Sequence, residues 1–170
     1  MRRIMVMGRC GAGKSTLARV LAERLGIKAH HLDQLSFAAG WVQKPAYDWH
    51  PKLEAIVAQD HWVIDGNDSA TLSMRLARAD SVIFLDFGRW RCLWQVLRRI
   101  STHHGRTRPD MAPDCPERLN LPFLIYVLTW DGSPRRKNLV HLVGHEDKII
   151  RLTSPKEVAT WLEKLESSAP

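Results

Sequence analysis

Gly8-Arg9-Cys10-Gly11-Ala12-Gly13-Lys14-Ser15 is the stretch that decides the fold, because it matches the phosphate-binding pattern G-x-x-x-x-G-K-[ST]. An apolar run at residues 3–7 precedes it, and apolar residues at helical spacing follow it from residue 17 to residue 25. Glycines let the backbone turn tightly and bring several N–H groups to one anion, and the N-terminus of the next helix adds about half a positive charge. The stretch therefore predicts a loop that binds the phosphates of ATP or a related nucleoside triphosphate.

The side chains of this loop have separate expected roles. Lys14 should reach the outer phosphates, Ser15 should ligate Mg²⁺ through its hydroxyl, and Thr16 should add a hydroxyl near the inner phosphates. Average residue frequencies produce a chance match to the pattern in roughly one chain in two hundred of this length. A strand before the loop and a helix after it make chance a weak explanation. The residues expected to contact the nucleotide are Gly8, Gly11, Ala12, Gly13, Lys14, Ser15 and Thr16.

Apolar runs and helical stripes alternate along the rest of the chain. Besides 3–7, the expected strands are 27–32, 62–64, 81–85 and 148–152, and helices are expected at 45–58, 71–79, 89–100, 122–130, 135–143 and 155–165. Strands that alternate with helices indicate a parallel sheet covered on both faces, with right-handed crossovers. We expect a single domain over residues 1–170, with a three-layer α/β/α P-loop fold around a five-stranded parallel sheet.

Composition narrows the class of protein further. The 170 residues suit one domain, and no apolar run approaches the roughly 20 residues of a membrane span. Three widely spaced cysteines argue against a disulfide framework and favour a cytoplasmic protein. The formal charge of +7 suits an anionic partner, whether nucleotide, nucleic acid or acidic lipid. We expect no membrane association, and a monomer or a dimer.

Three acidic residues stand where expected strands end: Asp33, Asp65 and Asp86. Because ligands of parallel sheets bind beyond the carboxyl ends of the strands, these carboxylates could converge near the phosphate loop. One would serve Mg²⁺ and another would accept a proton from a substrate hydroxyl. The alternative is that each of them caps the next helix or turn.

Residues 101–135 are expected to form a lid excursion, because residues 101–120 lack periodicity and contain several prolines. Arginines on such a lid would stabilise the charge of a transferring phosphoryl group and exclude water. A solvated basic face and a nucleic-acid surface remain alternatives. The arginines of this region are Arg89, Arg91, Arg98, Arg99, Arg106, Arg108, Arg135 and Arg136.

The histidines and tryptophans give weaker signals. His30 and His31 look like a metal pair, but neighbouring residues on a strand point to opposite faces. Trp41 is expected to pack in the core or at its rim, with stacking on a base or sugar as the alternative. Trp90 and Trp94 lie four residues apart on an expected helix and should face the core.

The chain resembles the adenylate-kinase-like P-loop proteins of the DNA topology modulation (FlaR-type) family over about residues 1–126. The resemblance rests on residues 8–16, 31–33, 40–41, 64–67, 84–87, 89–90, 107–111 and 115–117. The Thr-Arg-Pro-Asp-Met segment at 107–111 and the Cys-Pro-Glu segment at 115–117 are far more specific than the phosphate loop. The resemblance implies a nucleoside-monophosphate-kinase-like core with a helical or loop lid.

The same resemblance implies roles for single residues. Asp65 would lie near the metal and the acceptor, Arg98 and Arg99 would begin the lid, and Arg135 or Arg136 would follow it. Adenylate kinases carry Phe-Pro-Arg after this Asp-Gly pair, where the present chain has Asn67-Asp68. The arginine that grips a monophosphate is therefore missing there, and Arg75 is a candidate substitute.

These observations favour an ATP- and Mg²⁺-dependent kinase with an unknown small-molecule acceptor. Ser15 and Asp65 would organise Mg²⁺, and Asp33 would orient the acceptor hydroxyl. A nucleotide-dependent DNA-binding regulator and a slow ATPase switch without an acceptor are the alternatives. The residues expected to stabilise the moving phosphoryl group are Lys14, Arg98, Arg99 and Arg136.

Overall fold

Five parallel strands form the centre of the molecule in a computed structural model, which describes residues 1–167. In spatial order they are β2 (Ala29–His31), β5 (Trp62–Asp65), β1 (Arg3–Gly8), β6 (Ser81–Leu85) and β7 (Ile149–Leu152). All four pairings are parallel, and the register places both Val6 and His31 beside Asp65. The expected three-layer α/β fold with a five-stranded parallel sheet is confirmed.

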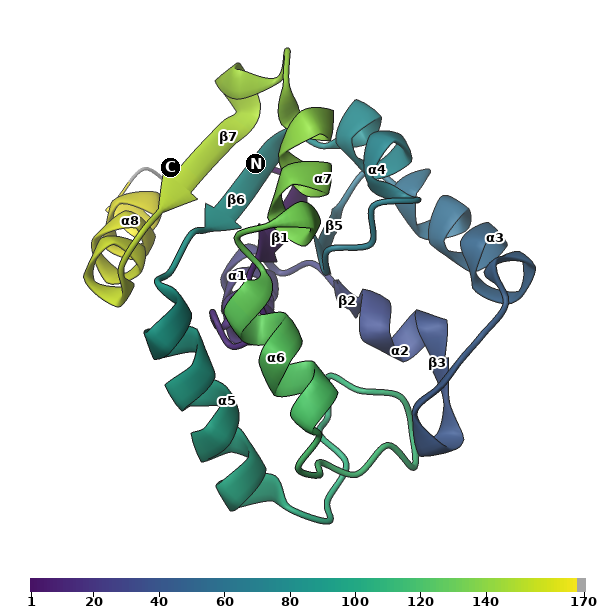
Figure 1. The fold of residues 1–170 in the computed structure, drawn as a ribbon. Helices are drawn as coiled ribbons and strands as arrows, with labels where there is room; N and C mark the ends of the chain where they lie inside the picture. The colour runs from purple at the N-terminus through teal and green to yellow at the C-terminus, as the bar shows by residue number, and fades with distance from the viewer. Residues whose placement is uncertain (168–170) are drawn as a thin grey trace.

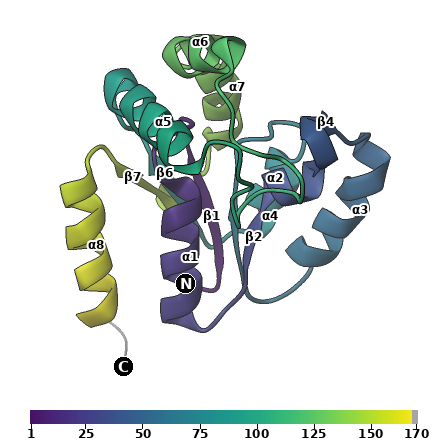
Figure 2. The same cartoon turned by 90° about the horizontal axis from the view of Figure 1, so that it is seen from below.

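Helices cover both faces of this sheet, as Figures 1 and 2 show. Several begin or end within two residues of the expected positions, but the short helix after β2 was not anticipated. Within residues 1–167, no helix combines the length and apolar character needed to cross a bilayer. The helices are α1 (Lys14–Leu25), α2 (Leu32–Ser36), α3 (Ala46–Val57), α4 (Leu72–Arg78), α5 (Arg89–His103), α6 (Leu121–Thr129), α7 (Ser133–Leu142) and α8 (Pro155–Ser167).

The side chains of β1 alternate between two hydrophobic cores, as the two-residue period of a strand requires. Ile4 and Val6 pack into the core that contains residues of α1 and α5, with α8 residues against it. Met5 and Met7 pack into the core formed with α3, α4 and α7. The phosphate loop therefore starts from the middle strand of the sheet, which is buried on both faces.

A small hairpin follows α2 and contacts the irregular segment 104–120. The hairpin joins β3 (Phe37–Ala38) to β4 (Val42–Gln43) through a short 3₁₀ turn (Ala39–Trp41), and a second 3₁₀ turn (Glu146–Lys148) precedes β7. The amide of Gly40 donates to the Asp114 carbonyl at 2.7 Å, and the Trp41 indole N–H donates to the Pro116 carbonyl at 2.9 Å. The packing role expected for Trp41 is therefore confirmed.

The expected excursion at 101–135 differs from the structure in its organisation. Residues 101–103 form the last turn of α5, and α6 lies within the excursion. Segment 104–120 has few hydrogen-bonded elements of its own, but Met111, Ala112 and Cys115 are buried against the hairpin. The segment is thus folded onto the neighbouring hairpin, and its service as a closing lid stays a prediction.

Trp90 and Trp94 do not face the core, so that expectation was wrong. Their side chains are 71% and 64% exposed. The buried stripe of α5 consists of Cys92, Val96 and Ile100.

Candidate nucleotide and acceptor site

The phosphate loop connects β1 to α1 with the backbone geometry that its glycines allow. Gly8, Gly11 and Gly13 have φ values of 140°, 85° and 91°, which side-chain-bearing residues rarely adopt. Gly13 is the N-cap of α1 and offers no side-chain cap. The first N–H groups of α1 are therefore available to an anion at the position where the helix dipole favours one. This geometry fits a bound phosphate.

Two contacts fix the loop in place. The Asn67 side chain accepts from the Gly8 amide at 3.1 Å and donates to the Gly8 carbonyl at 2.6 Å. On the other side, a Cβ atom at Gly11 would lie only 2.3 Å from the Cys92 carbonyl oxygen of α5. The loop is held between the segment after β5 and the inner face of α5.

The side chains of Arg9 and Lys14 have different partners. The Arg9 guanidinium is buried and donates to the Val127 carbonyl of α6 at 2.5 Å and to the Asp131 carboxylate. The Lys14 ammonium donates to the Arg9 carbonyl at 3.2 Å. Arg9 therefore joins the loop to α6, and Lys14 remains beside the loop that it is expected to serve.

Asp65, the acid at the end of β5, is paired with His31. Both side chains are buried, and His31 Nδ1 lies 2.7 Å from Asp65 Oδ1. Desolvation would lower the pKa of His31, but the hydrogen bond and the charge of Asp65 outweigh it and raise the pKa. One oxygen of the Asp65 carboxylate is therefore engaged with the imidazole. The expected metal role of Asp65 stays a prediction.

Asp33 lies in the first turn of α2, directly after β2. The residue as a whole is exposed, yet enough protein surrounds the carboxyl that desolvation is the largest influence and raises its pKa. The Lys14 ammonium opposes that rise, and so does Arg108, whereas Asp65 and Asp110 reinforce it. Asp33 is therefore within electrostatic reach of the phosphate-loop lysine.

Asp110 is a candidate site residue that was not selected from the sequence, although it lies in the specific 107–111 segment. Desolvation would raise its pKa, but the Arg108 guanidinium and the nearby Ser15 hydroxyl lower it. Arg108 Nη1 contacts the Asp110 carboxylate, and the Gln34 amide donates to the Pro109 carbonyl at 2.5 Å. These contacts bring segment 104–120 to the serine that is expected to bind Mg²⁺.

The arginines expected on the lid are separated in the structure. Arg99 Nε lies 3.1 Å from Glu117 Oε1, and the same carboxylate accepts from Arg108 at 2.5 Å. Burial lowers the pKa of Arg99, with the nearby Arg108 charge adding to the effect. Arg98 on α5 and Arg136 on α7 are exposed. Contact of these side chains with a nucleotide stays a prediction.

Asp86 is occupied by arginines on the β7 side of the sheet. Desolvation would raise its pKa, but hydrogen bonds from Arg135 at 2.8 Å and Arg151 at 2.8 Å hold the pKa below its ordinary value. Asp33 and Asp65 follow or end the neighbouring strands β2 and β5, and their convergence near the phosphate loop stays a prediction. Asp86 serves a separate ion-pair cluster.

Arg75 does not take the place of a monophosphate-binding arginine. Its side chain is fully buried and donates to the Gly66 carbonyl at 3.2 Å, the Asp68 carbonyl at 2.7 Å and the Thr71 hydroxyl at 3.2 Å. Desolvation lowers its pKa to about 10. Arg75 therefore supports the segment after β5 from within the protein.

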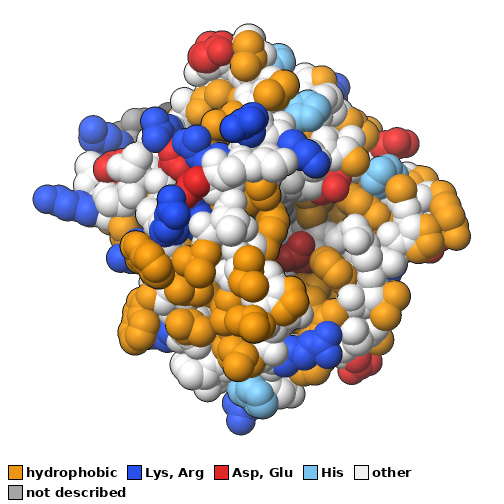
Figure 3. Space-filling model, viewed as in Figure 1, with side chains coloured by type: hydrophobic (Ala, Val, Ile, Leu, Met, Phe, Trp, Pro, Cys, Tyr) orange, Lys and Arg blue, Asp and Glu red, His pale blue; other side chains and the backbone are white. Residues whose placement is uncertain are grey.

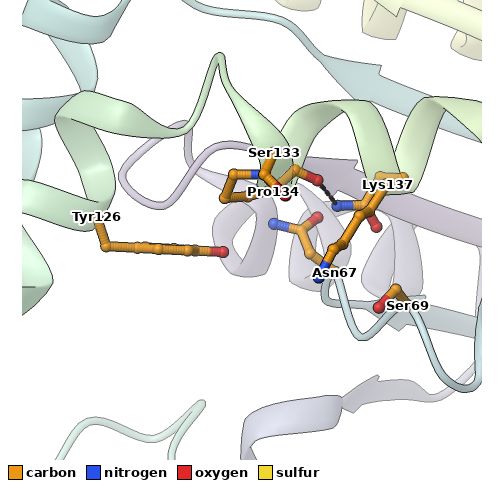
Figure 4. Close-up of a pocket in the computed structure, with 7 residues that line it drawn as sticks. Asn67, Ser69, Tyr126, Ser133, Pro134 and Lys137 are labelled. Carbon is orange, nitrogen blue, oxygen red and sulfur yellow. Dashed lines mark hydrogen bonds between the residues drawn. The ribbon is translucent and has the colours of Figure 1, made fainter.

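A pocket of about 220 Å³ opens between the segment after β5 and helices α6 and α7. Figure 4 shows Tyr126 extending from α6 toward Asn67, with Lys137 on the neighbouring helix α7. Desolvation raises the pKa of Tyr126 to about 12, and the charges of Cys10 and Asp33 add to the rise. The pocket is lined by Asn67, Ser69, Tyr126, Ser133, Pro134, Lys137 and Asn138.

The residues present fit Mg²⁺ bound together with a nucleotide. Within residues 1–167, no three His, Cys, Asp or Glu side chains are grouped so as to hold a metal ion on their own. Mg²⁺ beside phosphates needs only one or two protein oxygens, because phosphates and waters supply the remainder. The Ser15 hydroxyl, with the Asp110 carboxylate beside it, offers oxygens of this kind.

The fold and the phosphate loop define the class of P-loop kinase folds, and comparison with solved structures agrees. A gluconokinase from Sinorhizobium meliloti 1021 is similar with a TM-score of 0.51 and 17% identity, covering 99% of this chain and 98% of its own. Shikimate kinase from Aquifex aeolicus VF5 is similar with a TM-score of 0.52 and 18% identity, covering 96% of both chains.

An uncharacterized protein from Eubacterium ventriosum ATCC 27560 is similar with a TM-score of 0.53 and 14% identity, covering 98% of both chains. No protein-family model matches the chain, and no curated protein matches its sequence. At these identities the structural similarity establishes the fold, and the function has to be argued from the site itself.

Proposed function

We propose that this chain is an ATP- and Mg²⁺-dependent kinase that phosphorylates a hydroxyl group of a small acceptor. The observation that carries the proposal is the phosphate loop, whose glycines adopt positive φ values at the start of α1 with the Lys14 ammonium beside the loop. The charge of Lys14 acts on the carboxyl of Asp33, which lies in the first turn of α2. That carboxylate would orient an acceptor hydroxyl for in-line transfer.

The nucleotide half of the site would be made by the phosphate loop. Backbone N–H groups at the start of α1 would hold the phosphates, and Lys14 would neutralise the outer ones. Ser15 would ligate Mg²⁺, with Asp110 accepting a hydrogen bond from the hydroxyl or from a metal-bound water. When bound, Mg²⁺ would neutralise phosphate charge. Arg98, Arg99 and Arg136 remain the proposed candidates for the charge on the moving group.

The acceptor half would be the pocket between Asn67 and Lys137. Its volume of about 220 Å³ suits a small metabolite and is below the range of roughly 300–1,000 Å³ of drug-sized pockets. Its lining offers hydroxyl and amide groups and one ammonium, with no carboxylate among them. This chemistry fits a polyhydroxylated compound with at most one acidic group, and the names gluconokinase and shikimate kinase also point to small acceptors.

A nucleoside monophosphate fits this site less well. Its phosphate would call for a bidentate arginine, and Arg75, the nearest candidate in the sequence, is committed to Gly66, Asp68 and Thr71. The pocket is also small for a base and a ribose phosphate together.

Replacement of Asp33 by Asn tests the proposal. With ATP, Mg²⁺ and a panel of sugars, sugar acids and other hydroxylated metabolites, we expect acceptor-dependent ADP formation. Asp33→Asn should reduce its rate by about 10²–10⁴-fold, the usual contribution of a positioned proton acceptor. ATP affinity measured by calorimetry should change little. Asp48→Asn, at an exposed position in α3, is the matched control and should leave the rate unchanged.

Two results would contradict this function. One is full activity of the Asp33→Asn enzyme, and the other is ADP formation that no acceptor in the panel accelerates, which would indicate a slow ATPase. A DNA-related role, which the FlaR-type resemblance implies, is a competing proposal. Its sign would be a gel shift of duplex DNA that weakens steeply as the salt concentration rises.

A further inference from the structure

The outer surface of α5 and α6 is unusually apolar. Trp90 and Trp94 on α5 are 71% and 64% exposed, and Leu121 and Ile125 on α6 are 66% and 52% exposed. Figure 3 shows hydrophobic side chains gathered over these two helices, which pack against each other. We call this surface the α5–α6 patch. Its members are Trp90, Trp94, Leu97, Leu119, Leu121 and Ile125.

Helix α6 is poorly buried for its composition. Its sequence, Leu-Pro-Phe-Leu-Ile-Tyr-Val-Leu-Thr, contains one polar residue, yet among the described residues of the helix only Val127 is buried. A helix that is apolar all round normally lies inside a protein or an interface. The structure of one chain therefore leaves α6 without the cover that its sequence indicates.

The exposed stripe on α5 has the spacing of a helix–helix contact. Trp90, Trp94 and Leu97 are separated by four and then three residues, which is the spacing of a coiled-coil seam. All the members of the patch are uncharged, and the exposed Arg91 and Arg98 flank the stripe on one side, three and four residues from Trp94 and so about 60° and 40° round the helix from it. When two such surfaces meet, these guanidinium groups would lie at the border of the contact.

We propose that the α5–α6 patch is the interface of a homodimer, with a second copy of this chain as its occupant. The six side chains expose on the order of 700 Å² of apolar surface, counting about 150–250 Å² for each full aromatic side chain. This area exceeds the few hundred Å² usual for a monomer and is close to the ~800 Å² that each partner buries in a standard interface. An apolar centre with polar or charged residues at its border is typical of homodimers, and two-fold pairing is their commonest symmetry.

The interface would lie directly behind the phosphate loop. The inner face of α5 contacts that loop, since a Cβ atom at Gly11 would meet the Cys92 carbonyl at 2.3 Å and Val96 Cγ2 at 2.9 Å. A second copy on the outer face would hold α5 from the other side. The dimer does not depend on the proposed kinase activity, and it is tested without a nucleotide.

Sedimentation equilibrium across a hundredfold dilution series measures the mass of the protein in solution. The wild-type chain should sediment with twice the mass of one chain. Trp94→Glu should raise the dimer dissociation constant by about a hundredfold, as expected for a central tryptophan. Tyr47→Glu, at a 76% exposed aromatic position on α3, is the control and should leave the dimer intact. The melting temperature of each variant shows that it is folded.

Leu121→Glu on α6 is the second variant, and it keeps the test valid if Trp94→Glu fails to fold. Dissociation caused by either folded variant, with Tyr47→Glu still dimeric, supports the interface. A wild-type chain that is monomeric at every concentration overturns the proposal. So does a dimer that survives both substitutions in folded protein.

Discussion

Substitution of two glycines in the phosphate loop by alanine separates the backbone strain of the loop from its contact with α5. Gly11 and Gly13 have φ values of 85° and 91°, so alanine is strained at both positions by about 1–2 kcal/mol. At Gly13 the new Cβ atom meets nothing within 4 Å, whereas at Gly11 it lies 2.3 Å from the Cys92 carbonyl and 2.9 Å from Val96. Overpacking of this kind costs about 1–3 kcal/mol more.

The expected free energy of unfolding therefore falls by about 1–2 kcal/mol for Gly13→Ala and by about 2–5 kcal/mol for Gly11→Ala. Urea denaturation measures both losses, and comparison of the two variants cancels the effect of alanine on the unfolded chain. The diagnostic quantity is the difference of about 1–3 kcal/mol between them. If Gly11→Ala is no less stable than Gly13→Ala, the close approach of the loop to α5 is wrong.

Two further substitutions test buried groups near the site. Arg75→Met should lower the free energy of unfolding by about 2–4 kcal/mol, because it removes a buried donor from two half-buried carbonyls, whereas the exposed Arg78→Met control should change it by less than about 0.5 kcal/mol. His31→Gln should change how stability depends on pH. Since pairing with Asp65 raises the pKa of His31, its protonated form stabilises the fold below about pH 6.5, and this stabilisation is lost as the pH rises through the raised pKa. The stability difference between wild type and His31→Gln in urea titrations should therefore shrink as the pH rises above about 6.5, and a difference independent of pH would contradict the pairing.

The centre of the sheet was predictable because β1, β5 and β6 are buried on both faces and read as largely apolar runs, of which 81–85 is the clearest. The order of the strands was not part of the prediction. Periodicity describes one element at a time and does not say that β2 lies beside β5. For that reason the pairing of His31 with Asp65 was missed, although both residues stand at strand ends in the sequence.

The error at Trp90 and Trp94 has a different origin. Helix α5 carries two apolar stripes, one with Cys92 and Val96 and one with the two tryptophans. A helical period shows that both stripes exist, but it does not show which one meets the sheet. The smaller side chains occupy the inner stripe, where the phosphate loop approaches α5 so closely that a Cβ atom at Gly11 has no room.

Segment 104–120 could be predicted as an excursion but not as a link between the two halves of the site. Its contacts include ion pairs, such as that of Arg99 with Glu117, and hydrogen bonds to the β3–β4 hairpin, and a helical or strand period reports neither kind. Through Asp110 the segment reaches Ser15, where Mg²⁺ would be bound, and through Gln34 it is tied to the helix that carries Asp33. A displacement of this segment would therefore disturb the proposed metal ligand and the proposed acceptor base together. This irregular segment, which periodicity could not interpret, would thus couple the proposed nucleotide half of the site to the proposed acceptor half.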